Sequence, residues 1–293
     1  MQANLKDGPK KFWSFYRAKT KSGRIPKVVC FGDQKASTPV AKANLFDRFF
    51  ASVLQKPILH STASTQTATD NELHLVQTRI EEVTKELKAI NPLKAYGLDQ
   101  IQGRLLNECA SEIAPLLMRL INLYLRVGCV PKDWKCANIV PVFNKGNKED
   151  VTNCRPISLL SLVSKIAEHL VFAHFYSFIA GNIYLLQHGF VKGRSTITQG
   201  DQGVQTDVTF LDLSKAFDSV LHPHLISKLY QIGIKGPPLQ WLTIYLNYRV
   251  QRDVIDGKNS EWLPVTRGVL QGFLLGPALF VLFINDMPSI VCR

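Results

Sequence analysis

The sequence has no paired cysteines and no histidine cluster at zinc spacing. Its six cysteines are scattered, and none belongs to a Cys-x-x-Cys pair. Zinc sites and dense disulfide frameworks need closer and more regular spacing, so the sequence predicts neither. We expect buried, free thiols in a reducing compartment at Cys30, Cys109, Cys129, Cys136, Cys154 and Cys292.

A long hydrophobic run is also missing. The first residues, 1–7, lack the apolar core of a signal peptide. The longest apolar stretch, Gly272 to Ile284, is shorter than the roughly 20 residues that span a bilayer. These absences predict an intracellular, soluble protein of the cytoplasm or nucleus, with no membrane partner.

Acidic residues are few. Asp and Glu number 23 against 35 Lys and Arg, which gives a formal net charge of +12. Such an excess favours a polyanionic partner, because a protein that contacts phosphates releases condensed counterions. Charge alone fits a basic protein with a solvated surface equally well, so the motifs must decide between the two.

Apolar periodicity predicts an α+β protein. The segment 38–55 favours a helix with Ala41, Leu45, Phe49 and Val53 on one face. Ser and Thr dominate 60–71, which is typical of a mobile linker. A second helix is predicted over 102–127, with an apolar face made of Ile113, Leu116, Leu117, Leu120, Ile121, Tyr124 and Leu125. Further helices are predicted over 78–90, 164–178, 225–232, 239–248 and 277–286, and strands over 137–143, 208–213 and, as a hairpin, 250–265.

The segment Phe210 to Val220 resembles the first palm motif of reverse transcriptases from non-LTR retrotransposons. Other motifs follow that family's order, and the resemblance covers roughly Lys10 to the end. They are 131–135, 153–160, 187–190, 194–196, 245–249, 268–277 and 283–287. The resemblance identifies the chain as a jockey-like, LINE-type member and implies RNA-directed DNA synthesis on a right-hand polymerase fold. It also implies Mg²⁺, an RNA template, a DNA primer and deoxynucleoside triphosphates as ligands, and we expect a monomer.

The resemblance implies roles for two residues of the first palm motif. Asp212 is expected to be the catalytic carboxylate and a metal ligand, because nucleotide addition needs divalent ions held by carboxylates. The alternative for Asp212 is a cap after the strand. Phe217 is expected to lie under the sugar and exclude a 2′-hydroxyl, and its alternative is ordinary core packing. Asp218 is expected to be a cap or surface acid.

Four further residues are expected to contact nucleic acid or nucleotide. Lys145 lies in a basic turn and Arg155 opens the returning strand, so both could reach the triphosphate. A solvated turn lysine is the alternative for Lys145. Gln271 is expected to contact the nascent pair, and Gly272 to let the backbone approach the template; the alternative is a glycine turn before a buried helix.

The sequence departs from the family pattern after Asp212. No Tyr-x-Asp-Asp motif follows, and no two acidic residues are adjacent there. We therefore expect right-hand polymerase fingers and a partial palm, truncated before the catalytic Asp-Asp hairpin and inactive alone. A non-catalytic nucleic-acid-binding remnant of a decayed element, or a gene-model fragment, is the alternative. The expected segments are a helical extension (1–59), a polar linker (60–77), fingers (78–204) and a partial palm (205–293).

Overall fold

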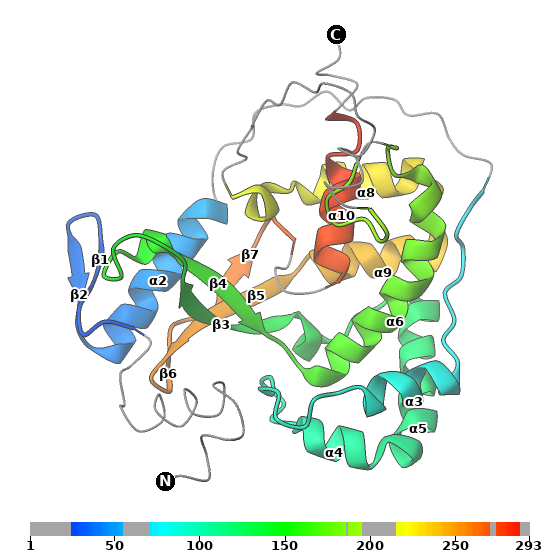
Figure 1. The fold of residues 1–293 in the computed structure, drawn as a ribbon, viewed down its shortest axis with the longest axis horizontal. Coiled ribbons are helices and arrows are strands. Elements are labelled where there is room, and N and C mark those ends of the chain that lie inside the picture. Colours follow the sequence, from blue (N-terminus) through cyan, green and yellow to red (C-terminus); the bar gives the residue numbers. More distant parts are fainter. Residues whose placement is uncertain (1–24, 55–70, 186, 195–214, 270–273, 288–293) are drawn as a thin grey trace, which may run out of the picture.

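The computed structural model describes residues 25–54, 71–185, 187–194, 215–269 and 274–287. Helix α2 and a small hairpin lie at one end, most other helices gather at the opposite end, and a long sheet runs between them (Figure 1). The predicted strand over 208–213 and most of the predicted linker lie outside the described residues. The mixture of helix and sheet agrees with the predicted α+β class.

The main sheet is built around β3 (Cys136–Phe143). Strand β4 (Cys154–Leu159) pairs with it antiparallel, with Phe143 opposite Cys154, and β5 (Arg249–Ile255) pairs with it parallel. On the far side, β6 (Lys258–Asn259) and β7 (Leu263–Val265) fold back antiparallel onto β5. Strand β3 lies in the segment expected to form the fingers (78–204), and β5 lies in the segment expected to form the palm (205–293). The boundary between fingers and palm stays a prediction.

The hairpin predicted around Asp256-Gly257 is confirmed. Asp256 and Gly257 connect β5 to β6 with φ angles of 50° and 75°. Two consecutive positive φ angles are the mark of a type I′ turn, whose twist matches that of the flanking strands. A separate small hairpin is formed by β1 (Val29–Phe31) and β2 (Gln34–Ala36).

Helix α2 (Pro39–Leu54) covers one face of the sheet. Phe46, Phe49 and Phe50 are buried there in one cluster with Ile139 of β3 and Ile255 of β5. The helix predicted over 38–55 is thus confirmed, but Ala41, placed on its apolar face, is exposed. A helical period of 3.6 residues, and not four, rotates Ala41 away from the sheet.

The remaining helices form the second hydrophobic cluster. The helix predicted over 102–127 is two helices, because α4 (Gly103–Glu108) ends at Cys109 before α5 (Ala110–Val127) begins. The apolar face predicted for α5 is partly wrong, because Leu116 and Leu120 are 70% and 40% exposed. The other helices of the described ranges are α3 (Ile80–Lys88), α6 (Leu162–Ile179), α8 (His222–Gln231), α9 (Gly236–Leu246) and α10 (Leu275–Phe283), with 3₁₀ turns η2 (Lys132–Lys135), η3 (Val151–Asn153), η4 (Ala180–Asn182) and η5 (Ala216–Ser219).

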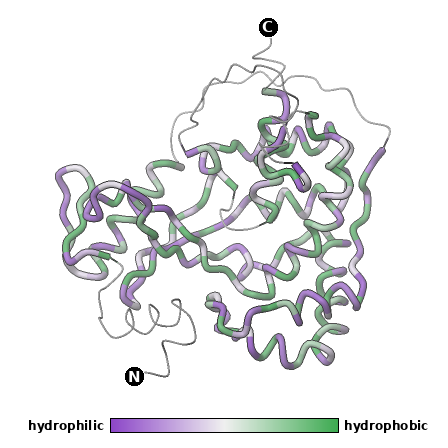
Figure 2. Tube along the Cα trace, viewed as in Figure 1, coloured by the Kyte–Doolittle hydropathy of each residue, from purple (hydrophilic) through white to green (hydrophobic). Residues whose placement is uncertain are grey.

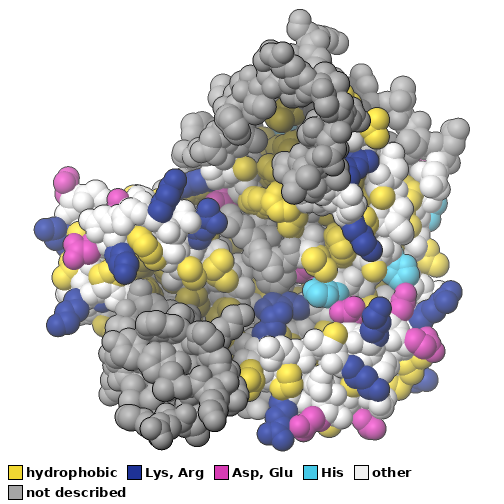
Figure 3. All heavy atoms as spheres, viewed as in Figure 1, with side chains coloured by type: hydrophobic (Ala, Val, Ile, Leu, Met, Phe, Trp, Pro, Cys, Tyr) yellow, Lys and Arg dark blue, Asp and Glu magenta, His cyan; other side chains and the backbone are white. Residues whose placement is uncertain are grey.

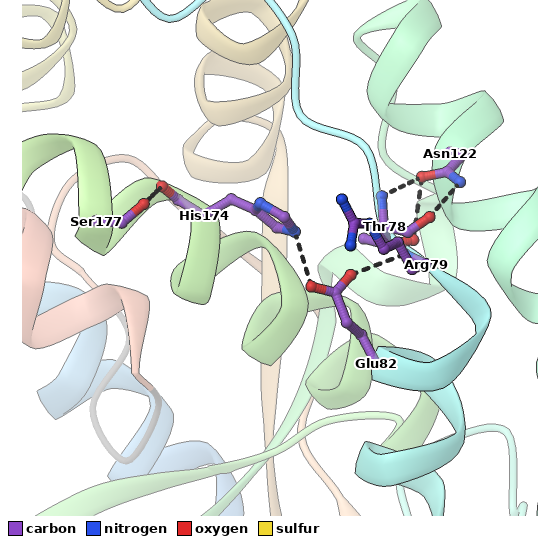
Figure 4. A network of polar contacts seen from close by, with 6 residues as sticks. All are labelled: Thr78, Arg79, Glu82, Asn122, His174 and Ser177. Atoms are coloured by element: carbon purple, nitrogen blue, oxygen red, sulfur yellow. Dashed lines mark hydrogen bonds and ion pairs between the residues drawn. The ribbon is translucent and has the colours of Figure 1, made fainter.

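Hydrophobic and hydrophilic positions are mixed along the helical end of the molecule (Figure 2). Polar contacts fix the start of α3 against its neighbours (Figure 4). The Asn122 side chain of α5 accepts from the backbone N–H of Thr78 at 2.8 Å and donates to its carbonyl at 2.9 Å. Glu82 accepts from the Arg79 N–H at 2.7 Å and lies 3.5 Å from His174 of α6. A carboxylate in the first turn of α3 also suits its helix dipole.

Two carboxyl groups are buried between α2 and β5. Asp47 is 4% exposed and Asp253 is fully buried. Burial raises the pKa of Asp47 to about 6, and burial together with the charge of Asp47 raises the pKa of Asp253 to about 9. The pair therefore retains a proton at neutral pH, because two buried like charges repel each other strongly.

This pair predicts a specific pH dependence of stability. Unfolding lowers the pKa of Asp253 to its ordinary value, so the folded state holds a proton that the unfolded state loses as pH rises from about 4 to 9. Stability therefore falls over that range. Asp253→Asn should flatten the fall, so that the variant gains in Tm relative to the unsubstituted chain at pH 8.5 but not at pH 5.

Thermal melts at the two pH values check this prediction. Asp33→Asn, in the exposed turn between β1 and β2, is the matched control and should change Tm equally at both. An equal change in Tm for Asp253→Asn at pH 5 and pH 8.5 would contradict the assignment of the proton to this pair.

Candidate active site

Backbone hydrogen bonds join two distant motifs of the sequence. The N–H of Gly268 donates to the carbonyl of Val220 at 2.8 Å, and the N–H of Val269 donates to that of Phe217 at 2.9 Å. Gly268 has a φ of 88°, and a Cβ there would lie 3.0 Å from the Asp218 Cα. Glycine is therefore required at this position by both conformation and close approach.

Buried His222 holds the same junction from the side of α8. Its Nε2 donates to the Gly268 carbonyl at 2.8 Å, and its Nδ1 lies 3.3 Å from the side-chain oxygen of Asn247. Burial lowers the pKa of His222, although its two hydrogen bonds oppose that shift. With its pKa below the ordinary value, the imidazole is neutral at pH 7, and its single N–H is on Nε2, facing the Gly268 carbonyl.

Helix α10 is held at both ends by side chains of other helices. Glu168 of α6 accepts from the N–H of Leu275, the first residue of α10, at 3.0 Å. Lys228 of α8 donates to the carbonyl of Phe283 at the other end. A carboxylate at a helix N-terminus and an ammonium at its C-terminus both complement the helix dipole. The connection from Gly268 to Leu275 is thus anchored where it begins and where it ends.

Glu168 belongs to a buried polar cluster. Burial raises its pKa to about 7, and the hydrogen bond from Leu275 and the positive charge of Arg249 oppose that shift. Arg249 is buried as well, and its guanidinium donates to the carbonyls of Tyr245 and Trp134 at 3.1 and 3.3 Å. These contacts satisfy much of the hydrogen-bonding capacity of a cation that is costly to bury alone.

The Phe217 ring lies among other aromatic rings. Its centroid is 4.8 Å from that of Phe280 in a stacked arrangement and 5.6 Å from that of Phe190 in an edge-to-face one. Phe217 is half-buried. The ring therefore contributes to core packing and still has an accessible part, so neither of its two predicted roles excludes the other.

A pocket adjoins the contact between Phe217–Val220 and Gly268–Val269, which we call the Phe217–Gly268 junction. Asp218, expected to be a cap or surface acid, lies in its wall, half-buried. The sheet contributes Ile139, Pro156 and Ser158, and the other lining residues include Arg249, Gln251, Arg267 and Gly268. An acidic side chain beside two arginines gives this pocket a polar wall.

Lys145 and Arg155 lie away from this pocket. Both are exposed on the β3–β4 hairpin, Lys145 in its turn and Arg155 opposite Val142. Pro156 and Ser158 line the pocket, and side chains alternate along a strand, so Arg155 is on the opposite face of β4. Neither side chain forms a hydrogen bond or ion pair with another described residue.

The other predicted site residues, Asp212, Gln271 and Gly272, lie outside the described residues. Within the described ranges, no group of three or more His, Cys, Asp and Glu side chains could hold a metal ion. No helix in those ranges is long and apolar enough to cross a membrane. The five described cysteines are free, as predicted, but each is half-buried, where we expected buried thiols.

Three residues of the site were not predicted. His222, Glu168 and Arg249 are polar side chains that each bond a backbone group far away in the sequence, and Arg249 also bonds the carbonyl of Tyr245, four residues before it. The only local signal is a charged residue inside an apolar helical run, as at Glu168 between Ala167 and Leu170. Such a residue indicates a buried polar contact but does not name its partner.

Comparison with known proteins gives the class of the chain. The family described as "Reverse transcriptase (RNA-dependent DNA polymerase)" matches residues 145–291, which is half of the 293 residues. The chain belongs to the reverse transcriptase family.

Similar proteins place it more closely within that family. It is 30% identical over 284 residues to a probable RNA-directed DNA polymerase from transposon BS of Drosophila melanogaster, covering 89% of this chain and 31% of that protein. It is 33% identical over 234 residues to the RNA-directed DNA polymerase from mobile element jockey of the same species, covering 74% and 25%. A jockey polymerase of Drosophila funebris is 29% identical over 265 residues, covering 84% and 29%. The predicted likeness to jockey-like, non-LTR reverse transcriptases is confirmed, and the chain spans about a third or less of the length of these relatives.

The close approach at Gly268 predicts an unusually sensitive position. Gly268→Ala should lower stability by about 1–2 kcal/mol for the left-handed backbone, with a further loss because the new Cβ meets the Asp218 Cα. Gly257→Ala is the matched control, since its φ is 75° but nothing lies within 4 Å of its Cβ.

Urea unfolding of both variants measures the difference. The loss at Gly268 should clearly exceed that at Gly257, and amide exchange at Val269 should become faster only in Gly268→Ala. Equal losses in the two variants would show that the junction is looser than the hydrogen bonds indicate.

Proposed function

We propose that the chain forms the nucleotide- and template-binding part of an RNA-directed DNA polymerase of a non-LTR retrotransposon. The observation that carries the proposal is the backbone pairing of Phe217–Val220 with Gly268–Val269 in a reverse transcriptase. This pairing aligns the residues just after Asp212 with those just before Gln271. RNA template, DNA primer and deoxynucleoside triphosphates are the proposed ligands.

Asp212 is the proposed catalytic carboxylate and Mg²⁺ ligand. A bound Mg²⁺ would activate the primer hydroxyl and neutralise charge on the triphosphate. Asp212 lies three positions before Lys215, where the described range 215–269 begins, so it is close in sequence to Phe217. The carboxylate fits a hard cation that prefers oxygen ligands.

The other proposed roles follow from position in the chain. Phe217 presents its accessible part to the sugar of the nucleotide, and Gln271 and Gly272 lie within the connection that His222 and Glu168 anchor. Lys145 and Arg155 are exposed on the β3–β4 hairpin and are free to contact phosphate oxygens. We propose that residues 78–204 act as fingers and 205–293 as part of the palm.

Nucleotide selectivity tests the proposal. In a fusion of these 293 residues to the segment that follows in the jockey polymerase, we expect primer extension on an RNA template with Mg²⁺, abolished by Asp212→Ala. Phe217→Val should raise the ratio of kcat/KM for ribonucleotides to that for deoxynucleotides by about tenfold or more, because the ring no longer excludes the 2′-hydroxyl.

Phe280→Val is the matched control, since it removes the ring stacked on Phe217. It should lower stability and depress the use of both nucleotide types alike, leaving the ratio unchanged. An unchanged ratio in a folded Phe217→Val protein would remove Phe217 from the site. A fusion that extends no primer at all would favour the non-catalytic alternative.

A further inference from the structure

One face of the main sheet is not covered by any described helix. Helix α2 packs on the face that carries Ala137, Ile139 and Ile255. The strand positions between those residues point the other way, and their side chains are exposed or half-buried. This open sheet face consists of Asn138, Val140 and Val142 of β3, Arg155, Ile157 and Leu159 of β4, and Val250, Arg252 and Val254 of β5.

Arg252 is held in a fixed orientation on the open sheet face. Its Nε donates to the side-chain oxygen of Asn138 at 2.9 Å, across the β3–β5 pairing. Its guanidinium carbon lies 4.5 Å from the centroid of the Trp262 ring, which is 41% exposed. The Asn138 bond uses Nε, and no other described residue hydrogen-bonds the two terminal nitrogens, which can therefore donate to a ligand.

This arrangement combines the two elements that recognise single-stranded nucleic acid. A planar aromatic ring offers a surface for base stacking, and a fixed guanidinium fork matches the geometry of a phosphate. Arg155 adds a second positive charge on the same face, roughly 13 Å along the strands from Arg252, at about 3.3 Å per residue. None of the nine strand residues of the face is acidic, and Glu261 is the nearest acid in sequence to Trp262.

Positive charge alone would not select this surface. On the side of the molecule drawn in Figure 3, Lys and Arg side chains are spread over both halves and do not form one patch. The pairing of an ordered arginine with an exposed tryptophan is what distinguishes the open sheet face from those scattered charges.

We propose that the open sheet face binds single-stranded RNA, with a base stacked on Trp262 and a phosphate held by Arg252. The inference rests on the proposed function, since a polymerase must hold the unpaired part of its template. It adds to that function a surface on the side of the sheet opposite the Phe217–Gly268 junction. The RNA backbone would run across β5 and β3 towards Arg155.

Fluorescence anisotropy with a labelled 20-nucleotide oligouridylate tests this proposal on the 293-residue chain. Trp262→Ala should weaken binding by about tenfold, because one stacked base is lost. Arg252→Gln keeps a planar group over Trp262 but removes the charge, so it should weaken binding and reduce the slope of log K against log salt by roughly 0.7. Trp262→Phe keeps an aromatic ring and should retain most of the affinity.

Arg48→Gln is the matched control, because it removes the same charge from α2, on the opposite side of the sheet. The affinity of Arg48→Gln for the oligouridylate should stay within about twofold of that of the unsubstituted chain. An RNA–DNA duplex of equal length, whose bases are already stacked, should lose much less affinity than the single strand in Trp262→Ala. Thermal melts show which variants keep the fold.

Each outcome decides the question. Loss of single-strand affinity in folded Trp262→Ala and Arg252→Gln, with retention in Trp262→Phe and Arg48→Gln, supports the proposal. Unchanged affinity in the first two variants overturns it, as does an equal loss in Arg48→Gln or the absence of RNA binding by the unsubstituted chain. Unchanged affinity at this face leaves nucleotide selection by Phe217 untouched, so the inference can fail while the proposed function stands.

Discussion

The contact between Gly268 and the turn at Phe217–Val220 is the constraint on which the rest of the site depends. About 50 residues separate its two sides, and two backbone hydrogen bonds of 2.8 and 2.9 Å join them. A side chain at position 268 would push the two segments apart, because its Cβ would lie 3.0 Å from the Asp218 Cα. Helices α8 and α9 and the β5–β7 hairpin fill the interval, so their packing decides whether the two motifs meet.

Buried polar side chains turn this contact into a rigid arrangement. His222 holds Gly268 from α8, and Glu168 holds Leu275 from α6. The N–H of Leu275 is buried, and leaving such a group without a partner costs roughly 1–3 kcal/mol; the carbonyl of Gly268 is partly buried. Packing of apolar surface could tolerate a small shift of α10, but these directional bonds could not. The ends of the connection that contains Gln271 and Gly272 are therefore fixed by hydrogen bonds and not by shape alone.

Local sequence patterns predicted most elements, because helices and hairpins follow from short-range periodicity and turn chemistry. The turn at Asp256-Gly257 and the helix over 38–55 are confirmed for that reason. The errors at Ala41 and Leu116 arose from assigning apolar residues to a buried face by spacing, since a small or apolar residue at a helix edge is tolerated in water. Parallel pairing of β3 with β5 could not be predicted, because their register depends on the helices between them.

Only part of the candidate site could be predicted, because short motifs can be read from a sequence and contacts between distant segments cannot. The motif resemblance identified Phe217 and the glycine-rich connection, since each is encoded within a few neighbouring residues. Arg155 was placed by its role in the family, but the alternation of β4 puts it on the face opposite Ser158 and the pocket. His222 and Glu168 were missed because their partners are backbone groups, which carry no residue identity to read from a sequence.

Arg249 connects the sheet to the helices around the site. It begins β5, and its guanidinium bonds the carbonyl of Trp134 just before β3 and that of Tyr245 at the end of α9. Its positive charge also stabilises the ionised form of Glu168, the residue that caps α10. Removing this one cation would take the guanidinium donor from two carbonyls and leave the buried Glu168 carboxyl group with the Leu275 hydrogen bond but without the nearby positive charge. The parallel pairing of β3 with β5 and the anchoring of α10 thus share one buried charge.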